Sequence, residues 1–301
     1  MAGKLDGTRC ICFKRRKEVR FLNRRGIFFE KRYPEIVEVL KKLKENFIID
    51  GEIVVFDKEN KPNFYLLAER EHTDDKIRIE ILSKKFPATY VVFDILNLNG
   101  KDLKNYPLLK RKSILNNLIK DSERVKKCYY TEDGEALWKV VKKLKLEGVM
   151  VKKKDSPYLQ KRSELWLKVK TLKSLDVIIC GYTEGEGKRE KLLGAILCGI
   201  YYKGKLIYLG RCGTGFDERE LENLSNTLKK IETNKNPFYE FKEEPSILKK
   251  IRFVKPKIVA EVKFMNLSKN LKMRAPSFKR LRNDKKVKDC VLREGELKKL
   301  L

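Results

Sequence analysis

The sequence predicts an α+β domain over residues 1–171, followed by a small antiparallel β-barrel over residues 172–301. The chain has 301 residues, 42% of them hydrophobic, which is enough for two domains that each have a core. Before residue 170, helix-like and strand-like segments are mixed, and the strands are mostly not joined as βαβ units. After it, short strands surround a single helix pattern, so we expect the hinge at residues 170–174.

In the first domain, apolar runs predict the strands and helical spacing predicts the helices. Pro34 favours a helix start, and Ile36, Val39, Leu40 and Leu43 recur on one helical face. The expected strands span residues 9–14, 18–23, 47–56, 88–96, 148–152 and 166–170, and further amphipathic helices span residues 110–120 and 133–146. The strands are therefore expected to form mostly antiparallel sheets.

In the second domain, several short strands accompany one helix, a combination typical of small barrels such as the oligonucleotide-binding (OB) fold. The expected helix spans residues 218–231, and the expected strands span residues 175–182, 192–202, 205–210 and 257–264.

The charge is strongly unbalanced. Lys and Arg number 71 against 42 Asp and Glu, for a net charge of +29. Heat adaptation would enrich Lys and Glu together, so the excess indicates a polyanionic partner, most simply nucleic acid. No run approaches the ~20 apolar residues of a membrane span, no apolar signal region follows Met1, and no basic amphipathic helix with an aromatic face is visible. We expect no membrane partner.

The cysteines predict a reducing, intracellular setting. There are 7, scattered and mostly within apolar runs such as that around Cys180, which is typical of buried free thiols. The only histidine is His72, which we interpret as a surface residue, so a multi-histidine zinc site and a Ser-His-Asp triad have little support.

The most informative motif lies at the start, where Lys4, Asp6, Gly7 and Arg9 form the pattern K-x-D-G-x-R. A lysine amine in this unit can attack the α-phosphorus of a nucleotide and carry off the nucleoside monophosphate. The same hexapeptide could also be an ordinary charged β-turn, so the rest of the chain has to decide between the two interpretations.

Further charged or aromatic clusters follow in order, each on or beside an expected strand. Asp50 and Glu52 share one face because strand side chains alternate, and so do Lys168 and Lys170. Each could instead be an ordinary strand surface, and Phe93 could simply be core. The other clusters are the basic turn at residues 23–26, Phe93-Asp94, Glu147 to Lys152, and the runs at 274–278 and 282–285.

This set of elements, from Lys4 to about Lys285, resembles the covalent nucleotidyltransferases, and most closely the ATP-dependent DNA ligases. The run at 274–285 is similar to the ligase domains of bacterial and archaeal end-joining enzymes. The resemblance implies an adenylation (nucleotidyltransferase) domain followed by an OB-fold domain. It also implies ATP and Mg²⁺ (or Mn²⁺) as cofactors, nicked double-stranded DNA as substrate, possible repair or replication proteins as partners, and a monomeric cytoplasmic protein of a prokaryote or virus.

The resemblance also implies a role for each residue. Lys4 would be the nucleophile that carries AMP. Because a free lysine is mostly protonated at neutral pH, the nearby cations Lys168 and Lys170 and a metal would favour its neutral amine. ATP or AMP would contact Lys4, Asp6, Arg9, Glu52, Phe93, Lys168, Lys170, Arg282 and Lys285. A metal would bind Glu52 and Glu147, and Arg282, Asp284 and Lys285 would orient pyrophosphate. DNA would contact Arg9, Arg24 and Lys152, the last in a basic loop.

Several alternatives stay open at this stage. The chain could be an RNA ligase, a capping-type guanylyltransferase, or a nucleic-acid-binding ligase fragment without activity. Related ligases carry an acidic residue two positions before the lysine, where this chain has Ala2. We therefore expect either that the natural chain begins upstream of Met1 or that self-adenylylation is impaired. Related ligases also have an N-terminal helical DNA-binding domain, so we expect the two domains here to hold DNA alone or with a partner.

Overall fold

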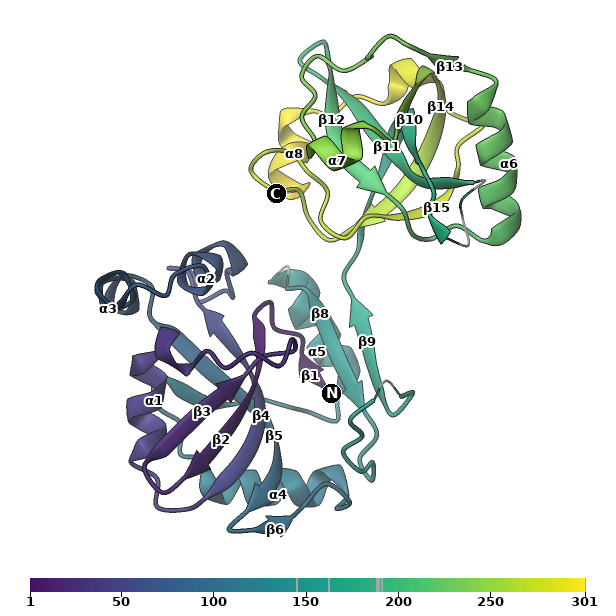
Figure 1. The fold of residues 1–301 in the computed structure, drawn as a ribbon. Coiled ribbons are helices and arrows are strands. Elements are labelled where there is room, and N and C mark those ends of the chain that lie inside the picture. The colour runs from purple at the N-terminus through teal and green to yellow at the C-terminus, as the bar shows by residue number, and fades with distance from the viewer. Residues whose placement is uncertain (145, 162, 188–189, 191, 301) are drawn as a thin grey trace. The chain divides into compact units, whose positions relative to one another are not determined.

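The computed structural model describes residues 1–144, 146–161, 163–187, 190 and 192–300. The chain divides into two compact units, Met1–Thr171 and Leu172–Leu301, each with its own buried core (Figure 1). The fold class is as predicted: an α+β unit with mostly antiparallel sheets precedes an all-antiparallel β unit. Among the described residues, every helix is too short or too polar to cross a bilayer.

The larger sheet of the first unit has the strand order β3-β2-β4-β5-β6, and β7 pairs with β5 in parallel. Its central strands are buried along most of their length, with Asp50 and Asp94 among mostly apolar residues. Its strands are β2 (Thr8–Arg15), β3 (Glu18–Leu22), β4 (Phe47–Val55), β5 (Ala88–Leu98), β6 (Lys101–Asp102) and β7 (Val125–Lys127).

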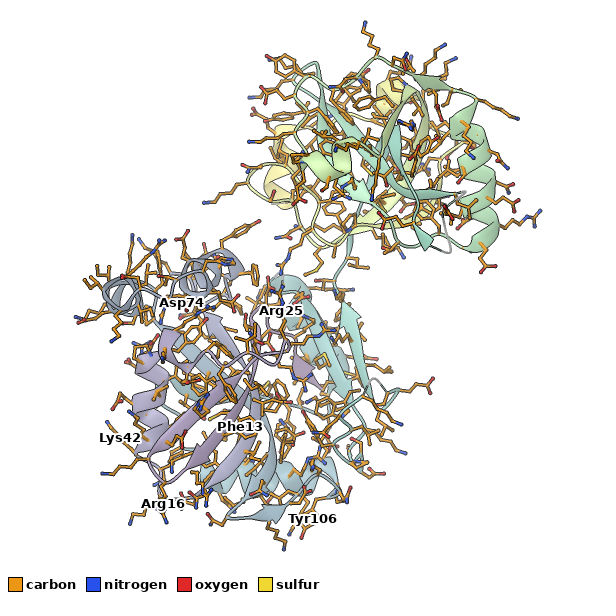
Figure 2. All side chains as sticks on the ribbon, in the orientation of Figure 1. Phe13, Arg16, Arg25, Lys42, Asp74 and Tyr106 are labelled. Atoms are coloured by element: carbon orange, nitrogen blue, oxygen red, sulfur yellow. The ribbon has the colours of Figure 1, made fainter. Side chains whose placement is uncertain are left out.

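The helix α1 (Pro34–Lys41) covers this sheet with Ile36 and Leu40, which are fully buried, as the sequence spacing predicted. The short 3-10 helix η1 (Glu30–Arg32) precedes it. The turn containing Arg16 joins β2 to β3, whereas Arg25 lies in the loop after β3, at the opposite end of these strands (Figure 2).

A second, three-stranded sheet carries the two ends of the first unit. Its order is β1-β8-β9, formed by Ala2–Gly3, Gly148–Lys152 and Trp166–Lys170. The helix α5 (Gly134–Lys143) packs against β8 and β1. This sheet joins the first residues of the chain to segments almost 150 positions later, and the two-residue strand β1 has no signal of its own in the sequence.

Two helices in the first unit were not predicted: α2 (Phe64–Glu71) and α3 (Lys76–Lys85). In α3, Ile77, Ile79 and Ile81 alternate as strand residues do, yet only Ile79 of the three is buried. The helix is set instead by Asp75, whose side chain accepts a hydrogen bond from the backbone of Arg78 at its first turn.

A fully buried ion pair ties α4 (Leu108–Leu118) to β5. The guanidinium of Arg111 donates to Asp94 through Nε and a terminal nitrogen at 2.8 and 3.0 Å, and both side chains are inaccessible to solvent. Arg111 also donates to the backbone oxygens of Tyr106 and Ser156, the latter at 2.9 Å. One side chain thus fixes β5, the start of α4 and the loop after β8.

The second unit is a six-stranded antiparallel sheet in the order β12-β11-β10-β14-β13, with β15 paired to β14. A bulge between Ile179 and Gly181 and another between Cys198 and Gly199 bend the long strands. The strands are β10 (Lys173–Glu184), β11 (Leu193–Tyr202), β12 (Lys205–Cys212), β13 (Glu232–Thr233), β14 (Ile251–Phe264) and β15 (Ser277–Leu281).

The expected helix of the second unit is α6 (Glu218–Lys229), and a reciprocal capping box of Asp217 and Glu220 begins it. The expectation of a single helix was wrong, because α7 (Pro245–Leu248), η3 (Val287–Asp289) and α8 (Glu294–Leu300) are also present. These are too short to leave a clear periodic pattern. All 7 cysteines are free, and 6 of them are buried, as expected for packed thiols.

We expect Asp94→Ala to lower the free energy of unfolding of the first unit by about 3–5 kcal/mol, because it leaves the buried guanidinium of Arg111 without a carboxylate. The only tryptophans, Trp138 and Trp166, lie in this unit, so tryptophan fluorescence during urea unfolding follows it selectively.

The control for this prediction is Glu80→Ala, which removes an exposed ion pair between Glu80 and Lys84 on α3. Such a pair contributes about 0.5 kcal/mol or less. Equal losses for the two variants would contradict the importance of the buried pair.

Candidate active site

The first strand places Lys4. Ala2 and Gly3 pair with Met150 and Val149 of β8, and the backbone nitrogen of Lys4 donates to the Gly148 oxygen at 2.8 Å. Ala2, the position at which related ligases have an acid, is buried in this strand. The backbone before Lys4 is thus fixed by strand pairing, and the side chain leaves the sheet at a defined position.

The amine of Lys4 forms an ion pair with one oxygen of Glu147, at the junction between α5 and β8. The other oxygen of Glu147 lies 3.8 Å from the amine of Lys170 on β9. Both Lys4 and Glu147 are largely buried. A single carboxylate therefore holds the amines of two predicted site lysines together.

Lys168 lies two residues before Lys170, opposite Met150 of β8, as the predicted alternation requires. Partial burial, together with the positive charges of Lys4 and Arg24, lowers the pKa of Lys168. One cationic cluster therefore contains Lys4, Lys168, Lys170 and Arg24. The repulsion between these like charges makes each charged form less favourable. An anion such as a phosphate would relieve that repulsion.

The glycine of the opening motif is required by close packing. A Cβ at Gly7 would lie 2.3 Å from the backbone oxygen of Ile53 on β4, so any side chain would push the turn away. Asp6 lies half-buried in this turn. The tight approach brings the turn between Lys4 and β2 against the strand that carries Glu52.

Arg9 and Asp50 form a second charged unit at this edge of the sheet. Arg9 donates to Asp50 at 3.1 and 2.8 Å and to the Tyr158 hydroxyl at 2.9 Å, and Tyr158 donates to Asp50 at 2.8 Å. Asp50 is fully buried, whereas Arg9 stays about half exposed. Burial lowers the pKa of Arg9, but the hydrogen bonds to Asp50 and the charge of Asp50 raise it by more. The half-exposed guanidinium therefore stays charged.

Glu52 is opposite Arg9 in the β2–β4 pairing. Burial raises the pKa of the Glu52 carboxyl to about 7; Asp50 and Glu147 add to the rise, whereas Lys4 and Arg9 oppose it. These interactions place Glu52 beside Lys4 and Glu147, which the sequence spacing alone could not show.

Glu52 and Glu147 are the predicted metal ligands. Within the described ranges, no group of three or more His, Cys, Asp or Glu side chains is arranged to hold a metal ion. Mg²⁺, however, is usually held by one or two carboxylates together with substrate phosphates and water. Two neighbouring carboxylates, one with its pKa raised by burial and by acidic neighbours, therefore fit Mg²⁺ or Mn²⁺ brought in with a nucleotide.

Phe93 lies in an aromatic cluster next to these charges. Its ring is 6.3 Å from that of Trp166 in an edge-on arrangement, and Trp166 is 5.7 Å from Tyr158. The ammonium of Lys152 lies 4.4 Å from the Phe93 centroid and 3.4 Å from that of Trp166. Burial lowers the pKa of Lys152 to about 7.

This position corrects the interpretation of Lys152 as part of a basic loop. It is the last residue of β8, and its amine is turned onto aromatic rings rather than into open solvent. The strand was expected to end at Lys152, so the error concerned the surroundings of its amine and not the bounds of the strand.

In the second unit, the predicted pyrophosphate residues meet in one turn after β15. Arg282 donates to both oxygens of Asp284, at 2.9 and 2.8 Å, and to Asp176 at 2.8 Å. Lys285 donates to the other oxygen of Asp176 at 2.5 Å. The three predicted residues are therefore clustered, together with an acid from β10 that was not predicted.

Two family models match the chain. The model described as "ATP dependent DNA ligase domain" matches residues 2–170, and "ATP dependent DNA ligase C terminal region" matches residues 189–285. The chain belongs to the ATP-dependent DNA ligase family. This ligase is 32% identical over 292 residues to the "Multifunctional non-homologous end joining protein LigD" of Mycolicibacterium smegmatis, covering 96% of the chain and 36% of that protein.

It is 29% identical over 313 residues to the DNA ligase of Thermococcus fumicolans, covering 98% of the chain and 54% of that enzyme. Among solved structures it resembles the ligase domain of M. tuberculosis LigD, with 29% identity, a TM-score of 0.50, and coverage of 97% and 92% of the two chains. The ligase thus spans about a third of the LigD proteins and about half of the archaeal enzyme. None of these comparisons favours an RNA ligase, a capping enzyme or an inactive fragment.

Sequence reasoning missed two residues of the candidate site: Tyr158, which bonds to both Arg9 and Asp50, and Asp176, which binds Arg282 and Lys285. Asp176 had a usable signal, since it is an acid at the start of an otherwise apolar strand. Tyr158 had none, because it lies in an irregular segment between β8 and β9.

We expect Glu52→Gln to stabilise the first unit increasingly as the pH rises from 5 to 8. The pKa of Glu52 is about 7 in the folded state against 4.5 for an unperturbed glutamate, so the folded state binds this proton more tightly. Wild-type stability is therefore lost as the pH rises through this window, by up to roughly 3 kcal/mol, whereas glutamine does not ionise. Urea unfolding followed by tryptophan fluorescence measures the difference at each pH.

The matched control is Glu80→Gln, which changes an exposed carboxylate on α3. If the difference in the free energy of unfolding between Glu52→Gln and wild type did not change between pH 5 and 8, the pKa of Glu52 would not be raised by burial.

Proposed function

We propose that this chain seals nicks in double-stranded DNA, with Lys4 as the residue that carries AMP. The observation that supports the proposal is the cluster around the Lys4 amine: Glu147 binds it, Glu52 is next to it, and Lys168 and Lys170 flank it. Phosphoryl transfer depends mainly on positioning and on neutralising charge, and these are the groups that both tasks require.

In the first step, the Lys4 nitrogen bonds to the α-phosphorus of ATP as the bond from that phosphorus to the β-phosphate oxygen breaks. Pyrophosphate leaves with the electron pair. The lysine ammonium gives up two protons overall, one before the attack and one from the new nitrogen–phosphorus bond, and both pass to solvent. Lys168 and Lys170 would bind the α-phosphate oxygens, and Arg282 and Lys285 the departing pyrophosphate, oriented by Asp284.

In the later steps, an oxygen of the DNA 5′-phosphate attacks the same phosphorus, the nitrogen–phosphorus bond breaks, and the lysine nitrogen takes up two protons from solvent to become an ammonium again. The 3′-hydroxyl then attacks the 5′-phosphorus, loses its proton, and releases AMP. Glu52 and Glu147 would hold a divalent metal ion, which supplies positive charge against the phosphate oxygens. Asp6 and Arg9 would contact the nucleotide, and Phe93 would form the platform for the base.

The substrate follows from the net charge of +29 and from the exposed arginines at the site. Arg24 lies in the loop after β3, close enough to Lys168 for their charges to interact, so a DNA 5′-phosphate bound at Lys168 would also meet Arg24. Arg9 is half exposed and suits a contact to the nick. Lys152 suits the base platform rather than DNA, because its amine rests on the rings of Phe93 and Trp166.

The relatives' names support a role in DNA repair, since several are called non-homologous end joining proteins. We propose that the chain closes the breaks such a pathway leaves, as a monomer acting with other repair proteins.

We expect Lys4→Arg to abolish the covalent adenylate while sealing of a nick already carrying AMP stays within about tenfold of wild type, because only the first two steps use the lysine nitrogen. Arginine can keep the ion pair with Glu147 but is not a nucleophile at neutral pH. Intact-protein mass spectrometry after incubation with ATP and Mg²⁺ measures the adenylate, and a denaturing gel measures sealing.

Lys4→Ala serves as a second variant that also removes the ion pair. If either variant still acquired one AMP per chain, Lys4 would not be the nucleophile. If wild type remained unmodified by ATP and also failed to seal a pre-adenylylated nick, the proposed activity would be wrong for this chain.

We expect DNA affinity to fall steeply with salt and Arg24→Ala to reduce the slope of log K against log[salt] by about 1 unit, because one phosphate contact is lost. Fluorescence anisotropy with a nicked duplex across a salt series measures the slope. Lys41→Ala, which removes an exposed charge paired with Glu38 on α1, is the control and should leave the slope unchanged. Identical slopes for wild type and Arg24→Ala would remove Arg24 from the DNA interface.

A further inference from the structure

We propose that Asp176 is a resident anion that occupies the pyrophosphate-binding cations Arg282 and Lys285, and that the outer phosphates of ATP must displace it. Asp176 would thereby limit how tightly the enzyme holds both ATP and pyrophosphate. The inference rests on the proposed function, which assigns these two cations to pyrophosphate, but it concerns a residue with no role so far.

Both carboxylate oxygens of Asp176 bind these two side chains. One oxygen is 2.8 Å from a terminal nitrogen of Arg282, and the other is 2.5 Å from the amine of Lys285. The side chains of Asp176 and Arg282 are 17% and 15% exposed, so the pair is shielded yet still open to solvent. A carboxylate that bridges two cations in this way holds the positions that two phosphate oxygens would take.

The backbone around the cations is fixed independently of Asp176. The backbone nitrogen of Arg282 donates to Val259 of β14 at 2.8 Å, and that of Lys285 donates to the oxygen of Arg282 at 3.1 Å. Asp284 holds the remaining edge of the guanidinium. Replacing the Asp176 carboxylate with a phosphate would therefore need only side-chain movement.

The charges also match an exchange. Arg282 and Lys285 carry two positive charges, and Asp176 and Asp284 carry two negative ones, so the cluster is neutral as it stands. The hydrogen bond to Asp176 raises the pKa of Lys285 and keeps its amine charged. Pyrophosphate can interact fully with both cations only when the bonds from Asp176 to Arg282 and Lys285 are broken.

The neighbouring strand offers a matched carboxylate. Asp176 pairs directly with Glu261 of β14, and Glu261 binds Lys279 at 2.6 Å and Arg280 at 2.9 Å. The two acids therefore lie side by side, each bridging two cations, but only Asp176 contacts the residues assigned to pyrophosphate. Glu261→Gln is thus the control for loss of a bridging carboxylate on this face.

The test is Asp176→Asn, which keeps the size of the side chain and removes its charge. Losing this competitor should lower the ATP concentration for half-maximal self-adenylylation about three- to tenfold, the range expected for one or two partly exposed ion pairs. The pyrophosphate concentration for half-maximal removal of AMP from the enzyme should fall by a similar factor. Sealing of a pre-adenylylated nick, which involves no pyrophosphate, should not change.

Glu261→Gln should leave both half-saturation values at the wild-type level, and thermal unfolding of each variant checks that the second unit is folded. Values for Asp176→Asn that equal or exceed wild type would overturn the proposal. So would an equal change in nick sealing, which would indicate a general structural role.

Direct titration of the full chain with pyrophosphate, followed by calorimetry, separates this inference from the proposed function. If wild type formed no lysyl-AMP and also failed to seal a pre-adenylylated nick, the proposed activity would be wrong. Tighter pyrophosphate binding by Asp176→Asn than by wild type would still support the exchange, and equal binding would refute it.

Discussion

The pairing of β1 with β8 is the constraint on which the site depends. It ties Ala2 and Gly3 to Met150 and Val149, and so delivers the Lys4 amine to Glu147. Neither partner could be placed by its own segment, since one lies in a two-residue strand and the other at a helix–strand junction. The long-range sheet gives the amine of a short lysine motif a defined position, which is what phosphoryl transfer would demand of the nucleophile that we propose Lys4 to be.

Three buried or largely buried carboxylates in the first unit are paired with arginine, whereas Glu147 is paired with the site lysines Lys4 and Lys170. Asp94 is paired with Arg111, Asp50 with Arg9, and Glu35 with the fully buried Arg70. Arginine suits this task because its planar fork binds a carboxylate through two bonds and stays charged when buried. The lysines, as single movable charges, suit phosphates that arrive and depart.

The sequence predicted the strands well because they are long apolar runs. The roles of the site residues came from the resemblance to DNA ligases, and the structure brings Lys4, Glu147 and Lys170 together. Prediction from the sequence failed where order comes from distant contacts. Strand β1 exists only because β8 pairs with it, and α3 is a helix although its isoleucines alternate. The expected strand ended correctly at Lys152, but the contact of its amine with Phe93 and Trp166 could not be predicted, because it depends on the pairing of β8 with β9. The acid Asp176 is understood only once the turn that carries Arg282 is folded against β14.

In each unit, one carboxylate bridges two of the cations to which we assign phosphate binding. In the first, Glu147 bridges Lys4 and Lys170; in the second, Asp176 bridges Arg282 and Lys285. Bare clusters of like charge would repel each other and splay apart, so an internal carboxylate keeps the cations close together in the absence of a ligand. In the second unit the consequence would be competition, because a phosphate that binds Arg282 and Lys285 would have to replace Asp176. For the proposed reaction, which releases pyrophosphate in its first step, such weakened binding would be an advantage, since an anion held with the full strength of both cations would leave slowly.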